Sequence, residues 1–391
     1  MLVKLATPLA WLNLTHDVRR LGVAVSGVTF AVSLIFMELG FLNALLESTV
    51  QIFRRLEGEI VLVSPAQYAL VAAERFDLRR IYDARAVAGV ASVSPVYIET
   101  TAAILRTTDQ RGYPIRVLAV RPEDDVLAVP ELAIHRDDLA ASGTALADVT
   151  SRKKFGFFSG DDALAAYQGE LNGKRLRLVG RFHLGVDFST DGNLLMTAAN
   201  FANFFPGRAG GHDPLSRVDL GVVRLEPGAD ARLVASELRR ALPPDVVPLL
   251  KDRLIRREMN FWRTNAPLGY IFMVGAVMGF IVGVLICYQI IHADITDHMR
   301  EFATLKAMGY KRRFFIFLVL RQCLYLSFLG FLPGAFLSYL AYAALASITG
   351  LTMHLTLPLA LLVLAATTLM CTLSGLLAIS KLLSLDPAEL F

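Results

Sequence analysis

The chain has 391 residues, of which 54% are hydrophobic and 19% are charged, and its formal net charge is +4. A mean hydropathy of +0.50 is too high for an ordinary soluble domain. The small net charge gives no argument for a nucleic-acid-binding protein.

Four apolar segments are each long enough to cross a bilayer, which takes about 20 helical residues. In chain order they are 21–46, 266–293, the greater part of 311–348, and 357–383. The first exceeds the length of a signal-peptide core and lacks an Ala-x-Ala-like cleavage site, so we expect it to be a retained helix. In the third we expect residues 311–321 to lie at the membrane surface and Pro333–Gly334 to kink the helix.

Positively charged residues predict the orientation of these helices, because Lys and Arg concentrate in cytoplasmic loops. They gather before the first helix, between the second and third, and near the C-terminus, and include Lys4, Arg19, Arg20, Arg300, Lys306, Lys311, Arg312, Arg313 and Lys381. We therefore expect an amphipathic cytoplasmic segment at 1–20 and cytoplasmic segments at 294–310 and 384–391. Residues 47–265 and the short loop 349–356 are expected outside the cytoplasm.

The outer segment has the pattern of a mixed α/β domain. Alternating apolar residues predict half-buried strands, "EIVLVSP" at 59–65, "IRVLAV" at 115–120, "RLRLVGRF" at 175–182 and "VDLGVVRL" at 218–225. Amphipathic helices are predicted for "PAQYALVAAERF" at 65–76 and "ADARLVASELRRAL" at 229–242. The charged segments 47–57 and 251–264 are expected to extend the first two membrane helices as a two-helix stalk.

Known catalytic and metal-binding patterns do not fit the sequence. "GELNGKR", Gly169–Arg175, lacks the spacing of a phosphate-binding loop. Asp187, Ser189, Asp191 and Gly192 begin like a calcium loop, but Ala198 stands where a bidentate Glu is needed, so we favour a turn at 191–193. No H-E-x-x-H helix or Cys pair accompanies the histidines. The sequence therefore predicts no catalytic residue, no metal and no cofactor.

Glu38 is an acidic residue inside the first apolar segment. A carboxylate within a membrane helix marks a contact with another helix or with a substrate. The alternative is that Glu38 lies close to the membrane interface, where it needs no partner.

The polar stretch "DITDHMREFATLKAMGYKRR" between the second and third apolar segments predicts a short amphipathic helix. We expect Asp294 to cap its N-terminus and Gly309 to end it. Its apolar stripe consists of Ile295, Met299, Phe302 and Leu305 with Met308 beside it, while Arg300, Glu301, Thr304 and Lys306 lie largely elsewhere. Such a helix either rests on the lipid surface or docks into a cytoplasmic partner.

"REFATLKAMGYKRR", residues 300–313, resembles the coupling helix of the MacB-like ABC transporter permeases, which include FtsX-like and LolC/LolE-like proteins. Segments 34–48, 180–205, 329–338 and the terminal "DPAELF" are similar to the DevC-type branch. This resemblance implies an integral membrane α-helical protein with four transmembrane helices and a large mixed α/β periplasmic domain on a helical stalk.

The same resemblance implies a non-catalytic permease subunit of an exporter in the bacterial inner membrane. A separate cytoplasmic ABC ATPase would bind ATP and dock on the coupling helix. The coupling residues would be Ile295, Met299, Arg300, Glu301, Phe302, Leu305, Lys306, Met308 and Gly309. Two permease copies would pair as a homodimer in the membrane lipids. The periplasmic domain would meet a membrane-fusion adaptor and an outer-membrane duct, and the cargo would be an amphiphile such as a glycolipid.

Two other functions belong to the same group of permeases. One is an FtsX-like regulator, which passes ATPase strokes to a periplasmic hydrolase and transports nothing. The other is a lipoprotein-releasing permease. The sequence assigns no residue to substrate binding.

Overall fold

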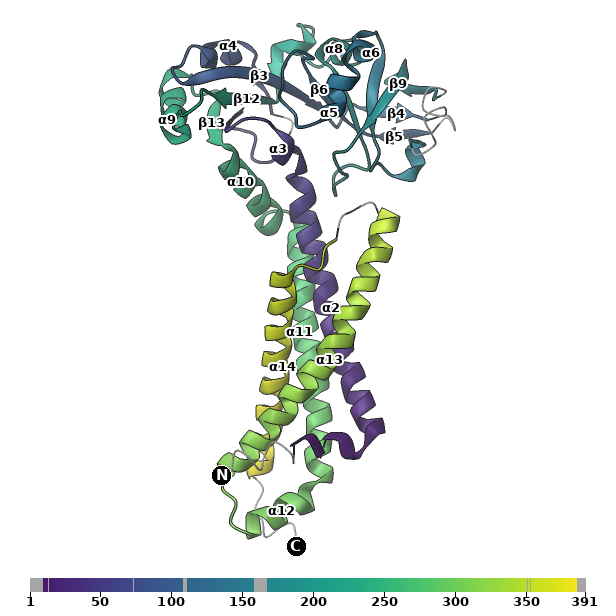
Figure 1. The fold of residues 1–391 in the computed structure, drawn as a ribbon, viewed down its shortest axis with the longest axis vertical. Coiled ribbons are helices and arrows are strands. Elements are labelled where there is room, and N and C mark those ends of the chain that lie inside the picture. Colours follow the sequence, from purple (N-terminus) through teal and green to yellow (C-terminus); the bar gives the residue numbers. More distant parts are fainter. Residues whose placement is uncertain are drawn as a thin grey trace. The chain divides into compact units, whose positions relative to one another are not determined.

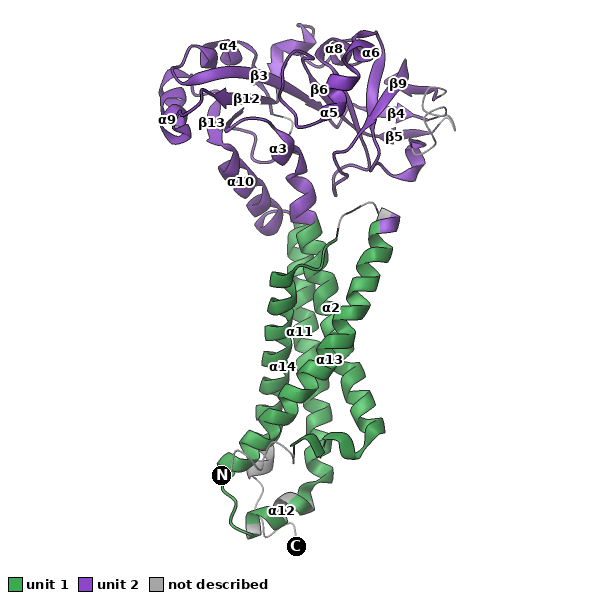
Figure 2. Ribbon diagram, viewed as in Figure 1, with its two compact units in different colours: residues 1–44, 267–346, 353–391 green, residues 45–266, 347–352 purple. Residues whose placement is uncertain are grey.

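The chain folds into two compact units (Figure 2). The computed structural model describes residues 10–12, 14–72, 74–107, 111–157, 167–349, 351 and 353–384. The helical unit comprises Met1–Ala44, Pro267–Ala346 and Met353–Phe391, and the sheet unit comprises Leu45–Ala266 and Ser347–Thr352. Each unit is described by itself below.

The helical unit is built from long apolar helices. They are α2 (Val18–Thr49), α11 (Pro267–Asp297), α13 (Arg312–Thr349) and α14 (Leu357–Ser384), joined between α11 and α13 by the short α12 (Met299–Ala307) (Figure 1). In the described part of the chain, these four long helices have the length and composition to cross a membrane. Of the segment 311–321, expected at the membrane surface, residues 312–321 are the first part of α13, which continues through Pro333.

Small residues allow α11 to pack closely on its neighbours. Gly275, Gly279 and Gly283 recur every four residues along one face of α11. A Cβ atom built on Gly279 would lie 2.4 Å from Leu34 of α2, and one on Gly283 would lie 2.0 Å from Met370 of α14. Close approach through such small-residue stripes is a common way for membrane helices to associate.

A second close contact joins α2 to α13 through hydroxyl groups. The Thr29 hydroxyl donates to the Gly330 carbonyl at 3.2 Å and the Ser33 hydroxyl donates to the Gly334 carbonyl at 3.4 Å. The Tyr342 hydroxyl donates to the carbonyl of Phe36. These bonds are formed where the glycines let the two backbones come close together.

Replacing Gly334 with leucine is expected to weaken the packing of α2 on α13. A Cβ at this position would meet Val32 Cγ1 at 2.6 Å and the Thr29 carbonyl oxygen at 3.2 Å. Overpacking of this kind costs about 1–3 kcal/mol. Cys287, Cys323 and Cys371 are free and buried, so a thiol-reactive dye can record the temperature at which the bundle opens.

Gly22→Leu is the matched control, because a Cβ on Gly22 of α2 meets nothing within 4 Å. The dye should react with the Gly334→Leu protein at a lower temperature than with the control. Equal opening temperatures for the two variants would show that the α2–α13 contact is not tightly packed.

The sheet unit is organised around an 11-stranded sheet with the order β13-β1-β12-β3-β6-β10-β7-β9-β8-β4-β5. Neighbouring strands are antiparallel except for the parallel pairs β6–β10 and β7–β9. The strands are β1 (Ile60–Val63), β3 (Val90–Glu99), β4 (Ile104–Arg106), β5 (Gly112–Pro114), β6 (Arg116–Val120), β7 (Thr144–Asp148), β8 (Gly169–Leu171), β9 (Lys174–Phe182), β10 (Asn193–Thr197), β12 (Leu220–Leu225) and β13 (Val247–Leu250). The short strands β2 (Phe76–Asp77) and β11 (Arg217–Val218) pair separately.

Helices pack around this sheet. They are α3 (Gln51–Arg55), α4 (Arg79–Arg85), α5 (Pro130–Ile134), α6 (Arg136–Ala140), α8 (Ala198–Phe204), α9 (Ala231–Ala241) and α10 (Lys251–Thr264), with short 3₁₀ turns at Lys153–Phe155 and Pro214–Ser216. The predicted helix at 229–242 is confirmed by α9, and the segment 251–264 is helical as α10, while its part in a stalk stays a prediction. Helix α10 packs against α3, which lies in the other predicted stalk segment.

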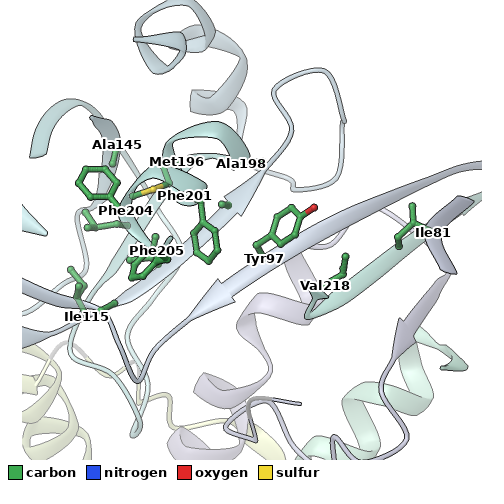
Figure 3. Packing of buried hydrophobic residues seen from close by; sticks show 14 of the residues in the cluster. Ile81, Tyr97, Ile115, Ala145, Met196, Ala198, Phe201, Phe204, Phe205 and Val218 are labelled. Carbon is green, nitrogen blue, oxygen red and sulfur yellow. The ribbon is translucent and has the colours of Figure 1, made fainter. Parts of the chain in front are cut away.

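The central strands β1 and β6 are buried on both faces, which corrects the expectation that they are half-buried, whereas β9 alternates between buried and more exposed residues as predicted. In β1, Ile60 and Leu62 belong to one hydrophobic cluster, and Val61 and Val63 belong to another on the opposite face. All five residues of β6 are buried as well. Figure 3 shows the first cluster, in which Tyr97 of β3 lies beside Phe201 of α8. The strand predictions at 59–65, 115–120, 175–182 and 218–225 are otherwise confirmed by β1, β6, β9 and β12.

The predicted helix at 65–76 is wrong. The described residues of this segment form turns followed by strand β2. The Leu70 amide donates to both carboxylate oxygens of Glu258, at 3.2 and 3.0 Å. A tertiary hydrogen bond therefore takes the donor that a helix would use, and tertiary context overrides the local apolar pattern.

Candidate coupling site

The junction between α11 and α12 differs from the helix start predicted at Asp294. Helix α11 continues to Asp297, and His298 is the N-cap residue of α12 without a side-chain capping bond. Asp294 therefore lies inside α11 and does not cap a helix. Its carbonyl accepts a bond from Nδ1 of His298 at 2.9 Å, and its carboxylate accepts a long bond from Nε2 of Gln322 at 3.5 Å.

The C-terminal end of α12 is fixed by Gly309, as predicted. Gly309 has a φ of +89°, in the left-handed region that favours glycine. The Gly309 amide donates to the Lys306 carbonyl at 3.1 Å and the Tyr310 amide donates to the Leu305 carbonyl at 3.2 Å. This pair of bonds is the Schellman motif, which satisfies the last carbonyls of a helix. Its hydrophobic contact fits too, because Leu305 and Tyr310 both pack against the bundle core.

The structure separates the predicted stripe into buried and exposed residues. Ile295 is only 3% exposed and packs within the bundle core, in α11 and not in α12. Leu305 is half-buried against the same core, and Met299 is also half-buried. The exposed members of the candidate set are Glu301, Lys306, Met308 and Gly309, together with Thr304. The side chains of Arg300 and Phe302 lie outside the described residues.

Among the candidate side chains that the structure describes, Met308 is the apolar one that is open to a partner. Its side chain is 63% exposed at the end of α12. Glu301 and Lys306 of α12 are exposed as well and carry charges of opposite sign. Such a surface can bind a partner through an apolar anchor and set the register through charges at its rim.

An ion pair between Arg20 and Asp297 connects the start of α2 to the end of α11. Both side chains are about half exposed, so the pair contributes little to stability, and it orients the two helix ends. Sequence analysis did not find this pair, because nothing in the local sequence links residues 277 positions apart. The sequence shows only that arginines lie near the start of α2 and aspartates near the end of α11.

Glu38 lies against α11. A Cβ on Gly275 would approach the Glu38 carboxylate atoms within 2.4 to 2.7 Å. The residue is half-buried, and within the described part of the chain no hydrogen bond or ion pair to its carboxylate is found. The absence of a side chain on Gly275 therefore makes room for Glu38 between α2 and α11.

The sheet unit contains a buried ionic cluster of Arg75, Glu99, Arg208 and Asp219. Asp219 accepts bonds from Nε of Arg75 at 3.1 Å and from the Ile98 amide at 2.7 Å, and it pairs with Arg208. Arg75 also pairs with Glu99 at 2.8 Å. The side chains of Arg208 and Asp219 are 1% and 5% exposed. The cluster holds β3 and β12 to the loops on either side and was not predicted.

Glu258 of α10 is a second buried acid. Its carboxylate accepts the Leu70 amide and, at 3.0 Å, Nε1 of Trp262. Burial raises the pKa of Glu258 to about 7, although both bonds and the nearby Arg257 act in the opposite direction. The acid therefore joins α10 to the loop after β1.

The residues that resemble the start of a calcium loop form a turn at Asp187–Thr190, four residues before the predicted 191–193 turn. Asp187 accepts bonds from the Ser189 amide and hydroxyl and pairs with Arg116 at 2.7 Å. Burial alone would raise the pKa of Asp187, but Arg116 and Ser189 hold it below its usual value. This carboxylate is thus committed to a structural ion pair.

"GELNGKR" forms a tight hairpin. Asn172 and Gly173 connect β8 to β9, with φ angles of +51° and +74°. Two left-handed residues are what a type I′ turn requires, and Asn-Gly is its preferred pair. The glycine therefore serves the turn.

Comparison with known proteins gives the following similarities. No curated protein matches the chain. The chain is similar to the periplasmic region of MacB from Actinobacillus actinomycetemcomitans, with 12% identity over 52% of this chain and 92% of that one, at a TM-score of 0.37. It is similar to the extracellular domain of the noncanonical ABC-type transporter YknZ from Gram-positive bacteria, with 10% identity over 49% and 100% and a TM-score of 0.34. A domain of a permease protein from Porphyromonas gingivalis matches with 16% identity over 50% and 77% and a TM-score of 0.28.

The family comparison covers the C-terminal part of the helical unit. Residues 273–387 match the model for the FtsX-like permease C-terminal domain. This range includes most of α11, all of α12 and α13, and the described residues of α14. The match therefore covers the segment that holds the candidate coupling helix together with the helices on either side of it.

Proposed function

We propose that this protein is the membrane permease subunit of an ABC exporter. The observation that carries the proposal is the short helix α12, with exposed Glu301, Lys306 and Met308, between two membrane-length helices of an FtsX-like permease domain. A helix at this place can transmit a conformational change of a separate ATPase to α11 and α13, because it is covalently continuous with both.

The partners follow from this role. A cytoplasmic ABC ATPase binds ATP and contacts α12, while the permease itself catalyses nothing. Two copies of the permease pair in the bacterial inner membrane. The sheet unit lies in the periplasm, where it meets a membrane-fusion adaptor that leads to an outer-membrane duct. The cargo is an amphiphile such as a glycolipid, as in DevC-type exporters.

An FtsX-like regulator of a periplasmic hydrolase is the alternative that the family match supports. It would use the same helical unit and the same ATPase contact. The two functions differ in what binds the sheet unit. Crosslinking followed by purification should recover an adaptor for an exporter and a cell-wall hydrolase for a regulator.

Met308→Asp is expected to weaken association with the ATPase. Met308 is 63% exposed, so the change should not disturb the bundle, but it would place a charge in the contact. Loss of a central apolar anchor commonly costs about 2 kcal/mol or more, roughly thirtyfold in affinity. The measurement is ATPase pull-down together with stimulated ATP hydrolysis in nanodiscs.

Leu233→Asp is the matched control, since Leu233 of α9 is also 63% exposed but belongs to the sheet unit. It should leave ATPase binding unchanged. Wild-type recruitment by the Met308→Asp protein would count against a docked α12 and favour a helix resting on lipid.

A further inference from the structure

A cavity with a volume of about 410 Å³ lies within the helical unit. It opens between the start of α2, the end of α11 and the first half of α13. Its volume falls within the roughly 300–1,000 Å³ that is typical of small-molecule sites. The candidate coupling residues of α12 do not line it.

The walls of the cavity are apolar. They are formed by side chains such as Leu21, Ala24, Ile290, Ile291 and Leu326. Ala24, Ile291 and Leu326 are each at most 5% exposed, so this surface is part of the packed bundle. An apolar wall between membrane-length helices suits a hydrocarbon chain.

The rim of the cavity carries charge, and one cation there is not engaged. Arg20 is paired with Asp297, and Asp17 is occupied by the amides of Arg19 and Arg20, at 3.0 and 3.2 Å. In the described ranges no carboxylate lies within salt-bridge distance of the Arg19 guanidinium, which is exposed at the rim. The Arg19 guanidinium is therefore a cation at the mouth of the cavity without an ion pair among the described residues.

The other acid at the cavity is also engaged. Asp294 is half-buried and has His298 and Gln322 as partners. An anion at Arg19 would thus meet a guanidinium that forms no ion pair, while the Asp17 carboxylate nearby is held by the Arg19 and Arg20 amides.

We propose that this cavity binds an anionic phospholipid, with its phosphate at Arg19 and one acyl chain along the apolar wall. Basic pockets between membrane helices on the cytoplasmic side bind anionic headgroups, and a guanidinium suits phosphate through paired hydrogen bonds. The proposal rests on the membrane location of the proposed function. It goes beyond that function because it names a site and a ligand that coupling to an ATPase does not require.

The cavity adjoins the junction between α11 and α12, so a bound ligand can affect α12. Its lining includes Asp294 and His298, which form the junction between α11 and α12. The Arg20–Asp297 pair lies at the same end of the bundle. An occupied cavity would therefore stabilise one arrangement of this junction.

The test is native mass spectrometry of the full-length protein released from detergent, titrated with phosphatidylglycerol, phosphatidylcholine or soluble glycerol phosphate. The wild type should bind one phosphatidylglycerol per chain more tightly than phosphatidylcholine, and should not bind glycerol phosphate. Arg19→Gln should weaken the phosphatidylglycerol complex about fivefold, as expected for one arginine near an anionic headgroup. Ala24→Phe, which fills the apolar wall, should weaken both phospholipids.

Arg313→Gln is the matched control, because Arg313 is exposed at the start of α13 and does not line the cavity. It should leave phosphatidylglycerol binding unchanged. If Arg19→Gln and Arg313→Gln weaken phosphatidylglycerol binding equally, the lipid binds through general positive charge and not at the cavity. If glycerol phosphate binds tightly, the ligand of the cavity is a soluble anion and not a lipid. Either result overturns the proposal.

A shift from dimer to monomer in the Arg19→Gln or Ala24→Phe protein, with lipid binding unchanged, would instead assign the cavity to a second copy of the chain and would also overturn it. ATPase pull-down on the same samples tests the proposed function independently. Arg19→Gln should retain the ATPase whether or not the lipid site exists.

Discussion

Replacing Asp219 with alanine is expected to destabilise the sheet unit by about 3–5 kcal/mol, because it removes a main partner of the buried Arg208 guanidinium and of the partly buried Arg75 guanidinium. Arg208 is 1% exposed at its side chain and Arg75 is 18% exposed, and both pair with Asp219. Glu99 alone would then face two arginines. The Ile98 amide would also lose its acceptor.

Urea unfolding of the full-length protein in detergent, followed by tryptophan emission, measures this loss. The chain has two tryptophans, Trp11 and Trp262. In a Trp11→Phe background, Trp262 of α10 reports on the sheet unit alone. Asp219→Ala should shift the unfolding midpoint to much lower urea.

Asp245→Ala is the control for this experiment. Asp245 pairs with Arg80 at 3.0 Å, but its side chain is 46% exposed. Surface pairs contribute about 0–1 kcal/mol, so this variant should unfold close to the wild type. Similar midpoints for both variants would contradict a structural role for the buried cluster.

Replacing Glu258 with glutamine is expected to stabilise the sheet unit above neutral pH. Burial raises the pKa of Glu258 from 4.5 to about 7, so the folded state binds this proton more tightly than the unfolded state does. The stabilisation from Glu258 is complete below about pH 4.5 and is lost as pH rises through about 7, by about 3 kcal/mol in all. Glutamine resembles the protonated acid and does not titrate.

The measurement is the urea midpoint of wild type and Glu258→Gln between pH 5 and pH 8, again with Trp262 as the only tryptophan. The two proteins should agree near pH 5, and the variant should be more stable at pH 8. Other titrating groups, including Asp187 and Arg257 nearby, are present in both proteins and cancel in the difference. A difference that does not change with pH would show that Glu258 titrates near its usual value.

Elements whose residues repeat with a clear period could be predicted from the sequence. The amphipathic pattern of 229–242 gave α9, and the strands near Ile60 and Arg116 were found from their apolar runs. Gly309 was identified as a helix end because glycine tolerates a positive φ, which it adopts here. These features depend on neighbours close in the chain.

Two local predictions failed for a common reason. The segment 65–76 has the apolar spacing of a helix, but Glu258 accepts its Leu70 amide from 188 positions away. Asp294 has the side chain of an N-cap, but the apolar surface that includes Ile295 extends α11 beyond it. In both places long-range packing outweighed a local preference of about 1 kcal/mol or less.

The sequence by itself determined the four apolar helices and the short polar helix between the second and third, because hydrophobicity is a property of composition along the chain. Only the tertiary structure decided which residues of that polar stretch are accessible, burying Ile295 and exposing Met308. It also decided the pairing of Asp219 with Arg208 and the cavity beside Arg19. The buried ion pair and the lining of the cavity combine residues that lie far apart in the chain. The free energies of their interactions depend on burial, which exists only once those segments have packed together.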